Sequence, residues 1–498
     1  MAEVIVVGGG LAGMVTALRL LERGYKVSLY DESETRLGGK AGADKNGGDY
    51  NRHGYHVFPA WYVNTWRLVE ELGIESNFVD FEDAHQMMKL EPDRVPRLTT
   101  LRGFTSFRHL WRNLKSGFIP IPDMLLFFYA ALDLASQPDR QKADLDQLSI
   151  TGFLRSRFYH TPRLELLFHE MVLKAITVPA YDCSAMTVKK VVRFWLRSPL
   201  PFLRILRGNL QTSFIEPLQQ RLQELGCDIH LAQRLERIQT DGTQVTKLHF
   251  QERGNGSLYE RPVEVFVLAI PPERVAKLLD DDDLYDAAPS LSRVLSLHAQ
   301  PMAAFDIYFT RKLPYLPREH VFLTESKFGL SFIDVSRTWP DNDASVLQVI
   351  ASDFIPLQTR STDKAAERII DELGKYLPFE ITDIKGYVSQ PHLKEPLFIN
   401  DEGAWHYRPK VREEDELTQE LTNLYMAGDY CRVPVDLASM EAAISSGLQA
   451  AAAIVGQPLE EARRIPPEYS ERLLILAKRV LTPVAALAKL ATLIRDRE

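Results

Sequence analysis

The sequence of 498 residues is 45% hydrophobic and 25% charged, with a formal net charge of −8 at pH 7. This composition excludes a disordered or fibrous chain, and the length predicts two or three packed domains. The acidic balance gives no electrostatic case for nucleic acid as a partner.

The cysteines and the apolar runs indicate the compartment. Cys183, Cys227 and Cys431 are far apart and match no metal-binding spacing, so we expect a reducing environment and no metal. No apolar run reaches the roughly 18 residues of a spanning helix. The first motif begins too close to Met1 to leave room for a signal peptide. We therefore expect a cytoplasmic protein, or one on the cytoplasmic face of a membrane.

The chain begins with a strand, a glycine motif, a helix and a second strand. An apolar, β-branched run over 4–7 predicts a buried strand, and residues 14–23 have the apolar spacing of a helix. A second strand is predicted over 26–30. The motif G-x-G-x-x-G lies between the first strand and the helix. This order is typical of the βαβ unit that binds a dinucleotide.

Each part of this unit has a physical role. Gly8 permits the sharp turn, Gly10 lets the backbone approach a pyrophosphate, and Gly13 lets helix and strand pack closely. The N–H groups and positive dipole end of the helix favour phosphates, and a carboxylate about 20 residues on accepts from ribose hydroxyls. The residues at the helix start and at the end of the second strand that fill these roles are Leu11, Ala12, Asp31 and Glu32.

A second glycine pair follows soon after this unit. Gly38, Gly39 and Lys40 place a cation and two glycines just beyond the ribose carboxylate. The arrangement resembles flavoproteins that bind FAD in an extended form, with the lysine offsetting phosphate charge. A surface turn with solvated cations is the alternative.

The next motifs make the resemblance specific. The series GG-K, G-x-H-x-F and ELGI stands here at 38–40, 54–58 and 71–74. It resembles the plant- and cyanobacterial-type phytoene and ζ-carotene desaturases of the flavin amine oxidase superfamily. The resemblance implies FAD as cofactor and brings Gly54, Tyr55 and His56 close to the isoalloxazine. His56 is also a catalytic candidate, for which a hydrogen-bonded core histidine is the alternative.

The segment over 89–203 departs from the dinucleotide pattern. Basic residues alternate with aromatic ones over 101–135, and 194–203 is apolar but too short to span a bilayer. Both stretches fit helices at a membrane interface. Buried helices of a substrate domain are the alternative.

The dinucleotide pattern resumes after residue 203. A helix over 212–225 and a strand over 227–231 precede Arg234 and Leu235, which the resemblance places beside the adenine. A later strand ends at Pro271, where the resemblance implies a return of the chain to the flavin.

Three candidate catalytic residues come from the second half of the chain. A strand predicted over 302–309 ends near Arg311, and the resemblance implicates this arginine in the active site or in quinone binding. Trp405 and Tyr407 belong to a segment similar to one that lines the site in the family. A solvated strand end and an ordinary aromatic loop are the alternatives.

The strongest downstream motif lies near the end of the chain. Gly428 and Asp429 follow a strand, and Ser439 and Met440 open a helix. The phytoene and ζ-carotene desaturases have a similar sequence over this motif. Gly428 clears room for the pyrophosphate, and Asp429 can accept a hydrogen bond from a ribityl hydroxyl. The positive end of the helix would stabilise the negative charge of a reduced flavin.

The tail over 466–498 is basic and rich in leucine and alanine. Its apolar spacing predicts two amphipathic stretches broken at Pro483. Such a tail can lie on an anionic membrane, pack back on the protein, or contact a second copy in a homo-oligomer.

The predicted fold is α/β, with a Rossmann-type FAD-binding domain built from discontinuous segments and an α+β substrate domain with helical membrane-proximal segments. The segments of the FAD-binding domain are 1–88, 204–285 and 415–460. The substrate domain comprises 89–203 and 286–414, and 461–498 forms an amphipathic helical tail.

The function that these motifs favour is FAD-dependent desaturation of an apolar polyene or isoprenoid such as a carotene, with hydride transfer to flavin N5. The resemblance implies a membrane quinone as electron acceptor, and oxygen is the alternative. An amine or amino-acid oxidase of the same fold remains an alternative, as do a carotene isomerase, a hydroxysqualene dehydroxylase and a non-catalytic FAD-binding scaffold. The expected partners are a lipophilic small molecule and a membrane surface.

Overall fold

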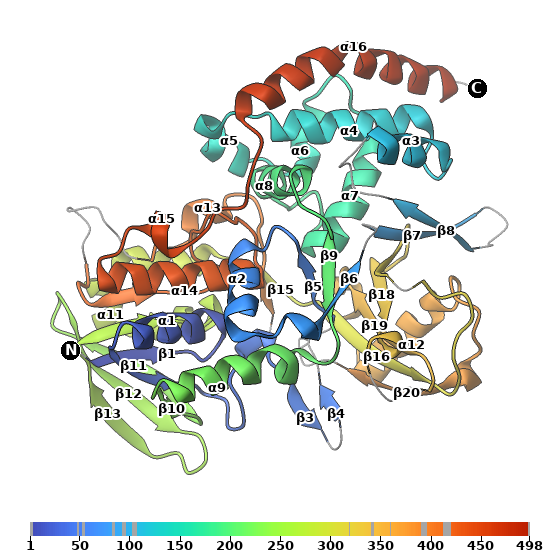
Figure 1. Ribbon diagram of the computed structural model, residues 1–498. Helices are drawn as coiled ribbons and strands as arrows, with labels where there is room; N and C mark the ends of the chain where they lie inside the picture. The colour runs from blue at the N-terminus through green and yellow to red at the C-terminus, as the bar shows by residue number, and fades with distance from the viewer. Residues whose placement is uncertain are drawn as a thin grey trace.

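The computed structural model describes residues 3–46, 49–51, 55–81, 85–91, 96–101, 107–317, 319–339, 343–358, 360–389, 396–411 and 420–496. These residues form a parallel sheet with its helices, a larger sheet beside it, and a layer of helices above (Figure 1). Within these ranges, no helix combines the length and hydropathy that crossing a bilayer requires.

The parallel sheet is assembled from distant parts of the chain. Its order is β10-β2-β1-β14-β22, and every neighbouring pair is parallel. The strands are β1 (Glu3–Val7), β2 (Lys26–Tyr30), β10 (Asp228–His230), β14 (Val265–Leu268) and β22 (Leu424–Met426). Strand β1 is central and almost wholly buried, as its apolar run predicts.

Two helices of this sheet cross at very close range. They are α1 (Leu11–Glu22) and α14 (Met440–Val455). A Cβ atom on Gly447 would stand 2.4 Å from the carbonyl oxygen of Ala12, and Thr16 Oγ1 donates to the Gly447 carbonyl oxygen at 3.3 Å. The absent side chain of Gly447 therefore sets the separation of the two helices.

The larger sheet has the order β20-β16-β19-β18-β17-β7-β8. Strands β17 and β7 run parallel, and the other neighbouring pairs are antiparallel. The strand predicted over 302–309 is β16, and β7 begins before the predicted domain boundary at residue 88. The bounds are β7 (His85–Leu90), β8 (Pro96–Leu101), β16 (Ala303–Phe309), β17 (Val321–Leu323), β18 (Leu330–Asp334), β19 (Val346–Ala351) and β20 (Ile384–Ser389).

The helical layer contains the segments for which the sequence left membrane and core interpretations open. Helix α4 (Ile121–Ala135) is mostly buried, with even Asp123 and Asp133 out of solvent. In α8 (Ala185–Leu196), Phe194 is buried. The other helices of the layer are α3 (Phe107–Lys115), α5 (Lys142–Asp146), α6 (Ile150–Arg155) and α7 (Pro162–Ile176). Most of 121–135 is therefore core.

The tail forms one helix, α16 (Glu471–Arg495), which lies along α4 (Figure 1). The predicted break at Pro483 is wrong, because contacts with α4 hold the helix on both sides of the proline. Lys478 Nζ lies 2.6 Å from Asp133 Oδ1, and Tyr129 Oη lies 2.9 Å from the Thr482 hydroxyl. Arg495 pairs with the buried Asp123 further along.

The remaining elements are shorter and connect these layers. They are α2 (Val63–Leu72), α9 (Glu216–Glu224), α10 (Pro272–Leu278), α11 (Asp282–Ala287), α12 (Thr362–Leu373), α13 (Ala404–Tyr407), α15 (Leu459–Ala462), β3 (Asp44–Asn46), β4 (Asp49–Asn51), β5 (Val57–Pro59), β6 (Phe78–Phe81), β9 (Leu203–Leu206), β11 (Gln233–Thr240), β12 (Val245–Glu252), β13 (Leu258–Pro262), β15 (Ala299–Gln300) and β21 (Leu397–Phe398).

The crossing of α1 and α14 gives a prediction. In an ordinary helix interior, alanine is more stable than glycine by about 0.5–1 kcal/mol. We expect Gly447→Ala to have the opposite sign and to lower the free energy of unfolding by about 1–3 kcal/mol, because the new methyl group overlaps a backbone oxygen. The midpoint of urea denaturation measures the change. Gly254→Ala, where a Cβ would meet open space, is the control, and equal midpoints for the two variants would contradict this account.

Candidate functional site

A cavity of about 1080 Å³ lies where the carboxyl ends of the parallel strands face the larger sheet. On one side it is lined by the turns after β1, β2, β14 and β22, and on the other by residues of the larger sheet. The carboxyl edge is where open parallel sheets bind ligands, because the turns and helix N-termini meet there.

The glycine motif forms the tightest part of this edge. Gly8 has a φ of 110°, and a Cβ on Gly13 would lie 1.9 Å from the Gly8 carbonyl oxygen. A Cβ on Gly10, by contrast, would point into open space. That space lies at the N-terminus of α1, so the structure has a cradle where the pyrophosphate of the implied FAD fits.

The two acidic residues after β2 have different hydrogen-bond partners. Asp31 accepts hydrogen bonds from the backbone N–H of Gly9 at 2.6 Å and of Ser33 at 2.8 Å. Burial raises the pKa of Asp31, although these two donors act in the opposite direction. Glu32 accepts from Arg274 at 3.0 Å. Both carboxylates line the cavity, and Asp31 also holds the glycine turn in place.

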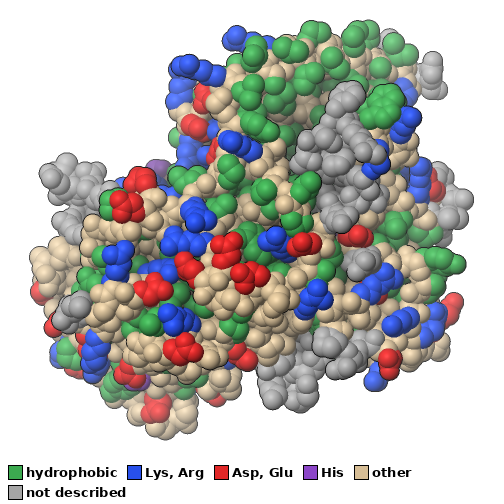
Figure 2. Space-filling view, viewed as in Figure 1, with side chains coloured by type: hydrophobic (Ala, Val, Ile, Leu, Met, Phe, Trp, Pro, Cys, Tyr) green, Lys and Arg blue, Asp and Glu red, His purple; other side chains and the backbone are tan. Residues whose placement is uncertain are grey.

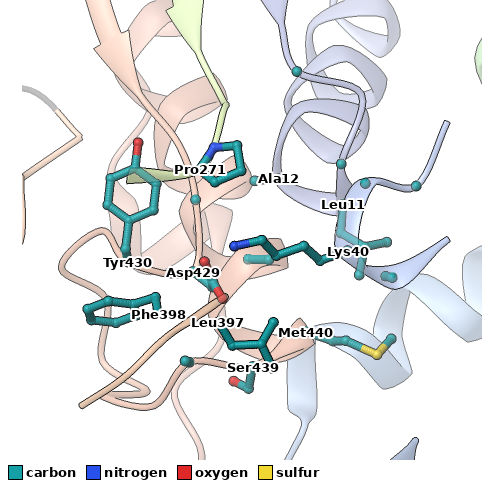
Figure 3. A pocket seen from close by; sticks show the side chains of 18 of the residues that line it. Leu11, Ala12, Lys40, Pro271, Leu397, Phe398, Asp429, Tyr430, Ser439 and Met440 are labelled. Carbon is teal, nitrogen blue, oxygen red and sulfur yellow. The ribbon is translucent and has the colours of Figure 1, made fainter. Parts of the chain in front are cut away.

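A cation lies between the turns of the cavity. Lys40 Nζ lies 2.9 Å from Glu273 Oε1 and donates to the Pro396 carbonyl oxygen at 3.0 Å. In Figure 3, Lys40 and Asp429 point into the same space. Burial raises the pKa of Asp429, and the charge of Lys40 opposes that rise.

A buried arginine holds the turn that carries Asp429. Arg408 is 1% exposed, forms an ion pair with Asp436, and donates to the carbonyl oxygens of Asp429 at 2.7 Å, Tyr430 at 3.0 Å and Cys431 at 2.9 Å. The guanidinium has five rigidly placed donors, so one side chain fixes three successive peptide groups. Arg408 therefore positions the backbone around Asp429.

The second helix terminus at the cavity belongs to α14. Ser439 caps it by accepting from the Ala442 N–H at 3.2 Å, and both Ser439 and Met440 line the cavity. Behind them, the buried carboxylate of Glu441 accepts four hydrogen bonds at 2.7–2.9 Å from the N–H and side-chain groups of Asn64 and Thr65. Burial raises the pKa of Glu441 to about 7. The carboxylate joins the start of α14 to α2.

Most of the predicted cofactor residues meet at this cavity. Gly13 packs behind the glycine turn instead, and Gly54 lies outside the described residues. That these residues bind the cofactor stays a prediction. Those that line the cavity are Gly8, Gly10, Leu11, Ala12, Asp31, Glu32, Gly38, Gly39, Lys40, Tyr55, His56, Arg234, Leu235, Pro271, Gly428, Asp429, Ser439 and Met440.

The predicted catalytic residues separate into two groups. His56 lines the cavity, whereas Arg311, Trp405 and Tyr407 are not among the described lining residues. Arg311 is about half exposed and pairs with Asp383 at 2.7 Å. Trp405 packs beneath the ammonium group of Lys142. Arg311 follows the end of β16 and pairs with Asp383 just before β20, so its role at the reacting end stays a prediction.

The far part of the cavity is largely apolar. It is lined by side chains from the larger sheet, from α7 and α8, and from β9. They include Ile176, Val191, Trp195, Leu203, Met302, Phe322 and Ile350. Lys174, also at this end, is almost fully buried and pairs with Glu170. This part can accommodate a hydrophobic chain.

Sequence reasoning missed the buried polar groups that position the site. Arg408, Asp436 and Glu441 are not among the predicted site residues, although they hold the backbone around Asp429 and the start of α14. Their partners are distant in sequence, so only an acidic or basic residue in an otherwise apolar context could have signalled them.

Comparisons with known proteins agree with this geometry. The model of the family described as flavin containing amine oxidoreductase matches residues 11–455. Zeta-carotene desaturase of Arabidopsis thaliana is 24% identical over 92% of this chain and 86% of its own length. For 15-cis-phytoene desaturase of Narcissus pseudonarcissus the identity is 28%, over 91% of this chain and 79% of the relative.

Solved structures share the fold at low identity. An oxidoreductase from Methanosarcina mazei has a TM-score of 0.67 and 13% identity, covering 91% of this chain and 100% of that one. Putrescine oxidase bound to putrescine has a TM-score of 0.64 and 16% identity, covering 92% and 99%. At these identities the likeness shows the fold alone.

The four hydrogen bonds to Glu441 give a prediction. Glu441→Gln would turn an amide N–H toward donors that now face a carboxylate oxygen. We expect the free energy of unfolding to fall by about 1–3 kcal/mol, the usual range for a buried donor left without an acceptor. Urea denaturation measures it. Glu260→Gln removes one charge from an exposed pair with Lys247 and should change stability by less than about 0.5 kcal/mol. Equal effects would contradict a clamping role for Glu441.

Proposed function

The chain belongs to the family of flavin-containing amine oxidoreductases, and from this premise we propose that it uses FAD to desaturate a polyene or isoprenoid chain of the carotene type. FAD is its cofactor and the chain is an oxidoreductase. The identity of the substrate is the proposed part.

One observation carries the proposal. A single cavity joins the glycine cradle, rich in polar groups, to an apolar part lined by Trp195, Phe322 and Ile350. A dinucleotide fits the first part and a hydrocarbon chain the second. The carotene desaturases to which the chain is similar along nine-tenths of its length have names that match this chemistry.

The chain's own residues orient the reactants and set the local field. Bound FAD would supply a hydride acceptor at flavin N5, and desaturation would also require the loss of a proton from the adjacent carbon of the substrate. The N-terminus of α14, capped by Ser439, favours negative charge at the cavity, and so favours the reduced cofactor. The apolar walls keep water away from the reacting carbons.

The amine-oxidase alternative loses its support. It relied on Trp405 and Tyr407 as an aromatic pair in a small polar site. Trp405 instead lies under Lys142, near the guanidinium groups of Arg408 and Arg432. Neither aromatic residue is among the described lining residues of the cavity.

Anaerobic bleaching of the flavin band tests the proposed reaction. The purified yellow protein is mixed with liposomes that contain a C40 polyene, and in parallel with a panel of amines and amino acids. We expect bleaching by the polyene alone, and mass spectrometry of a product lighter by two hydrogens. Bleaching by an amine would overturn the proposal.

The position of Asp429 in the cavity gives a prediction on cofactor retention. Asp429→Ala removes a carboxylate expected to accept from a ribityl hydroxyl, and the loss of a hydrogen bond to a charged group corresponds to about 10–100-fold weaker FAD binding. The ratio of flavin to protein absorbance after gel filtration measures it. Arg311→Ala, outside the cavity, should keep the wild-type ratio. An Asp429→Ala protein that stays fully yellow would refute this flavin placement.

We also propose that the outward face of α16 rests on a lipid bilayer. Residues on this face are 41–68% exposed although they are apolar, and Figure 2 shows them as a patch across the top of the molecule. Lys478, Lys489 and Arg495 turn toward the protein, whereas Arg472 and Arg479 are exposed beside the apolar residues. Apolar insertion is therefore the main attraction, and these two arginines add to it on an anionic membrane. The exposed apolar residues are Leu473, Leu476, Val480, Leu481, Val484, Leu487, Leu490, Leu493 and Ile494.

Contact with a bilayer through α16 would give the protein access to both a lipophilic substrate and the quinone acceptor. We predict that Val480→Asp combined with Leu487→Asp reduces flotation with liposomes by tenfold or more, because each buried apolar side chain contributes about 1.5–3 kcal/mol. Leu258→Asp, at another exposed apolar position, is the control. Unchanged flotation of the double variant, with flavin content intact, would exclude this face as the contact.

A further inference from the structure

A polar cluster interrupts the apolar part of the cavity. The Tyr55 hydroxyl lies 2.6 Å from Ser331 Oγ and also forms a hydrogen bond with His320 Nε2. Tyr55 and His320 both line the cavity, close to Met302 and Ile350. The sequence predicted Tyr55 as a cofactor contact, whereas its hydroxyl turns to the larger sheet.

The register of the larger sheet fixes this cluster at the cavity. Ile350, Ser331 and Phe322 stand directly opposite one another on β19, β18 and β17, so their side chains share one face. His320 lies two residues before Phe322 and therefore on that face too, with ring centroids 4.4 Å apart. Tyr55, on the segment before β5, closes onto this row.

The hydroxyl of Tyr55 retains one hydrogen-bonding position. A phenol has one proton and two acceptor positions. Burial raises the pKa of Tyr55, so the proton stays at neutral pH. In the described part of the chain its two partners are His320 and Ser331. Tyr55 donates its proton to one of these partners and accepts a hydrogen bond from the other. One lone pair of the Tyr55 oxygen therefore remains able to accept a further hydrogen bond.

We propose that this lone pair accepts a hydrogen bond from the O–H of a hydroxylated isoprenoid, so that the site prefers an isoprenoid alcohol to the hydrocarbon of the same chain. The inference deepens the proposed function and rests on it. A hydrocarbon cannot form a hydrogen bond with a polar group in the apolar wall of the cavity. A few placed polar groups in an apolar pocket fix the orientation of a ligand that can form one. His320 and Ser331 act as positioning residues that hold the Tyr55 oxygen in place.

Binding of matched ligands to the FAD-loaded protein tests the inference without turnover. The probes are a linear C20 isoprenoid alcohol, its methyl ether and the corresponding hydrocarbon, titrated in detergent micelles while tryptophan fluorescence is recorded, since Trp195 lines the cavity. We expect the alcohol to bind about tenfold more tightly than the other two, the usual worth of one buried hydrogen bond. Equal affinity for the alcohol and its ether overturns the inference, and this arm needs no variant.

Tyr55→Phe should abolish the preference for the alcohol while the hydrocarbon binds as in the wild type, which also reports that the cavity is intact. Tyr387→Phe is the matched control, because it removes a tyrosine hydroxyl from β20 of the same sheet, where that hydroxyl donates to Asp363 at 2.5 Å. A preference that survives Tyr55→Phe means that the cluster only braces the fold, and overturns the inference. If the alcohol is preferred but neither ligand bleaches the flavin, the proposed dehydrogenation fails and the binding assignment stands.

Discussion

The structure depends on one constraint, that parallel strands bring their carboxyl ends to the same edge of a sheet. Strands β1, β2, β14 and β22 come from the beginning, the middle and the end of the chain, and each ends in a turn at the cavity. The N–H groups of these turns and of two helix termini therefore converge on one space. That convergence, rather than any single motif, makes the edge a site for a phosphorylated cofactor.

Buried charge holds these distant segments together. Arg408 ties three consecutive peptide groups of the last turn to Asp436, and Glu441 ties the start of α14 to α2. A charge out of water is costly unless every hydrogen-bonding position is used. In both cases several partners surround the charge, so the local backbone has little freedom. The cavity is thus preorganised by groups that stand behind its lining.

The apolar part of the cavity is lined by residues of the larger sheet, and the position of that sheet below the helical layer bears on how a substrate reaches the cavity. The helical layer above it presents an apolar face along α16 (Figures 1 and 2). A protein that rests on a bilayer through this face would take a lipophilic substrate from the membrane itself. The cluster around Tyr55 then provides a polar feature that would place a long, flexible chain in register with the flavin.

The sequence by itself determined the cofactor fold and its turns, because local signals specify them: apolar β-branched runs, glycines at turns and helix starts. Asp31, Lys40 and Asp429, which it predicts as cofactor contacts, all line one cavity. It did not determine the partner of Arg311, which is Asp383, or the continuity of α16 through Pro483, which contacts with α4 maintain. The sequence also did not predict that Arg408 pairs with Asp436, or that Tyr55 pairs with His320 and Ser331. Such contacts join residues far apart in the chain, and no local pattern encodes a partner that only tertiary packing brings near.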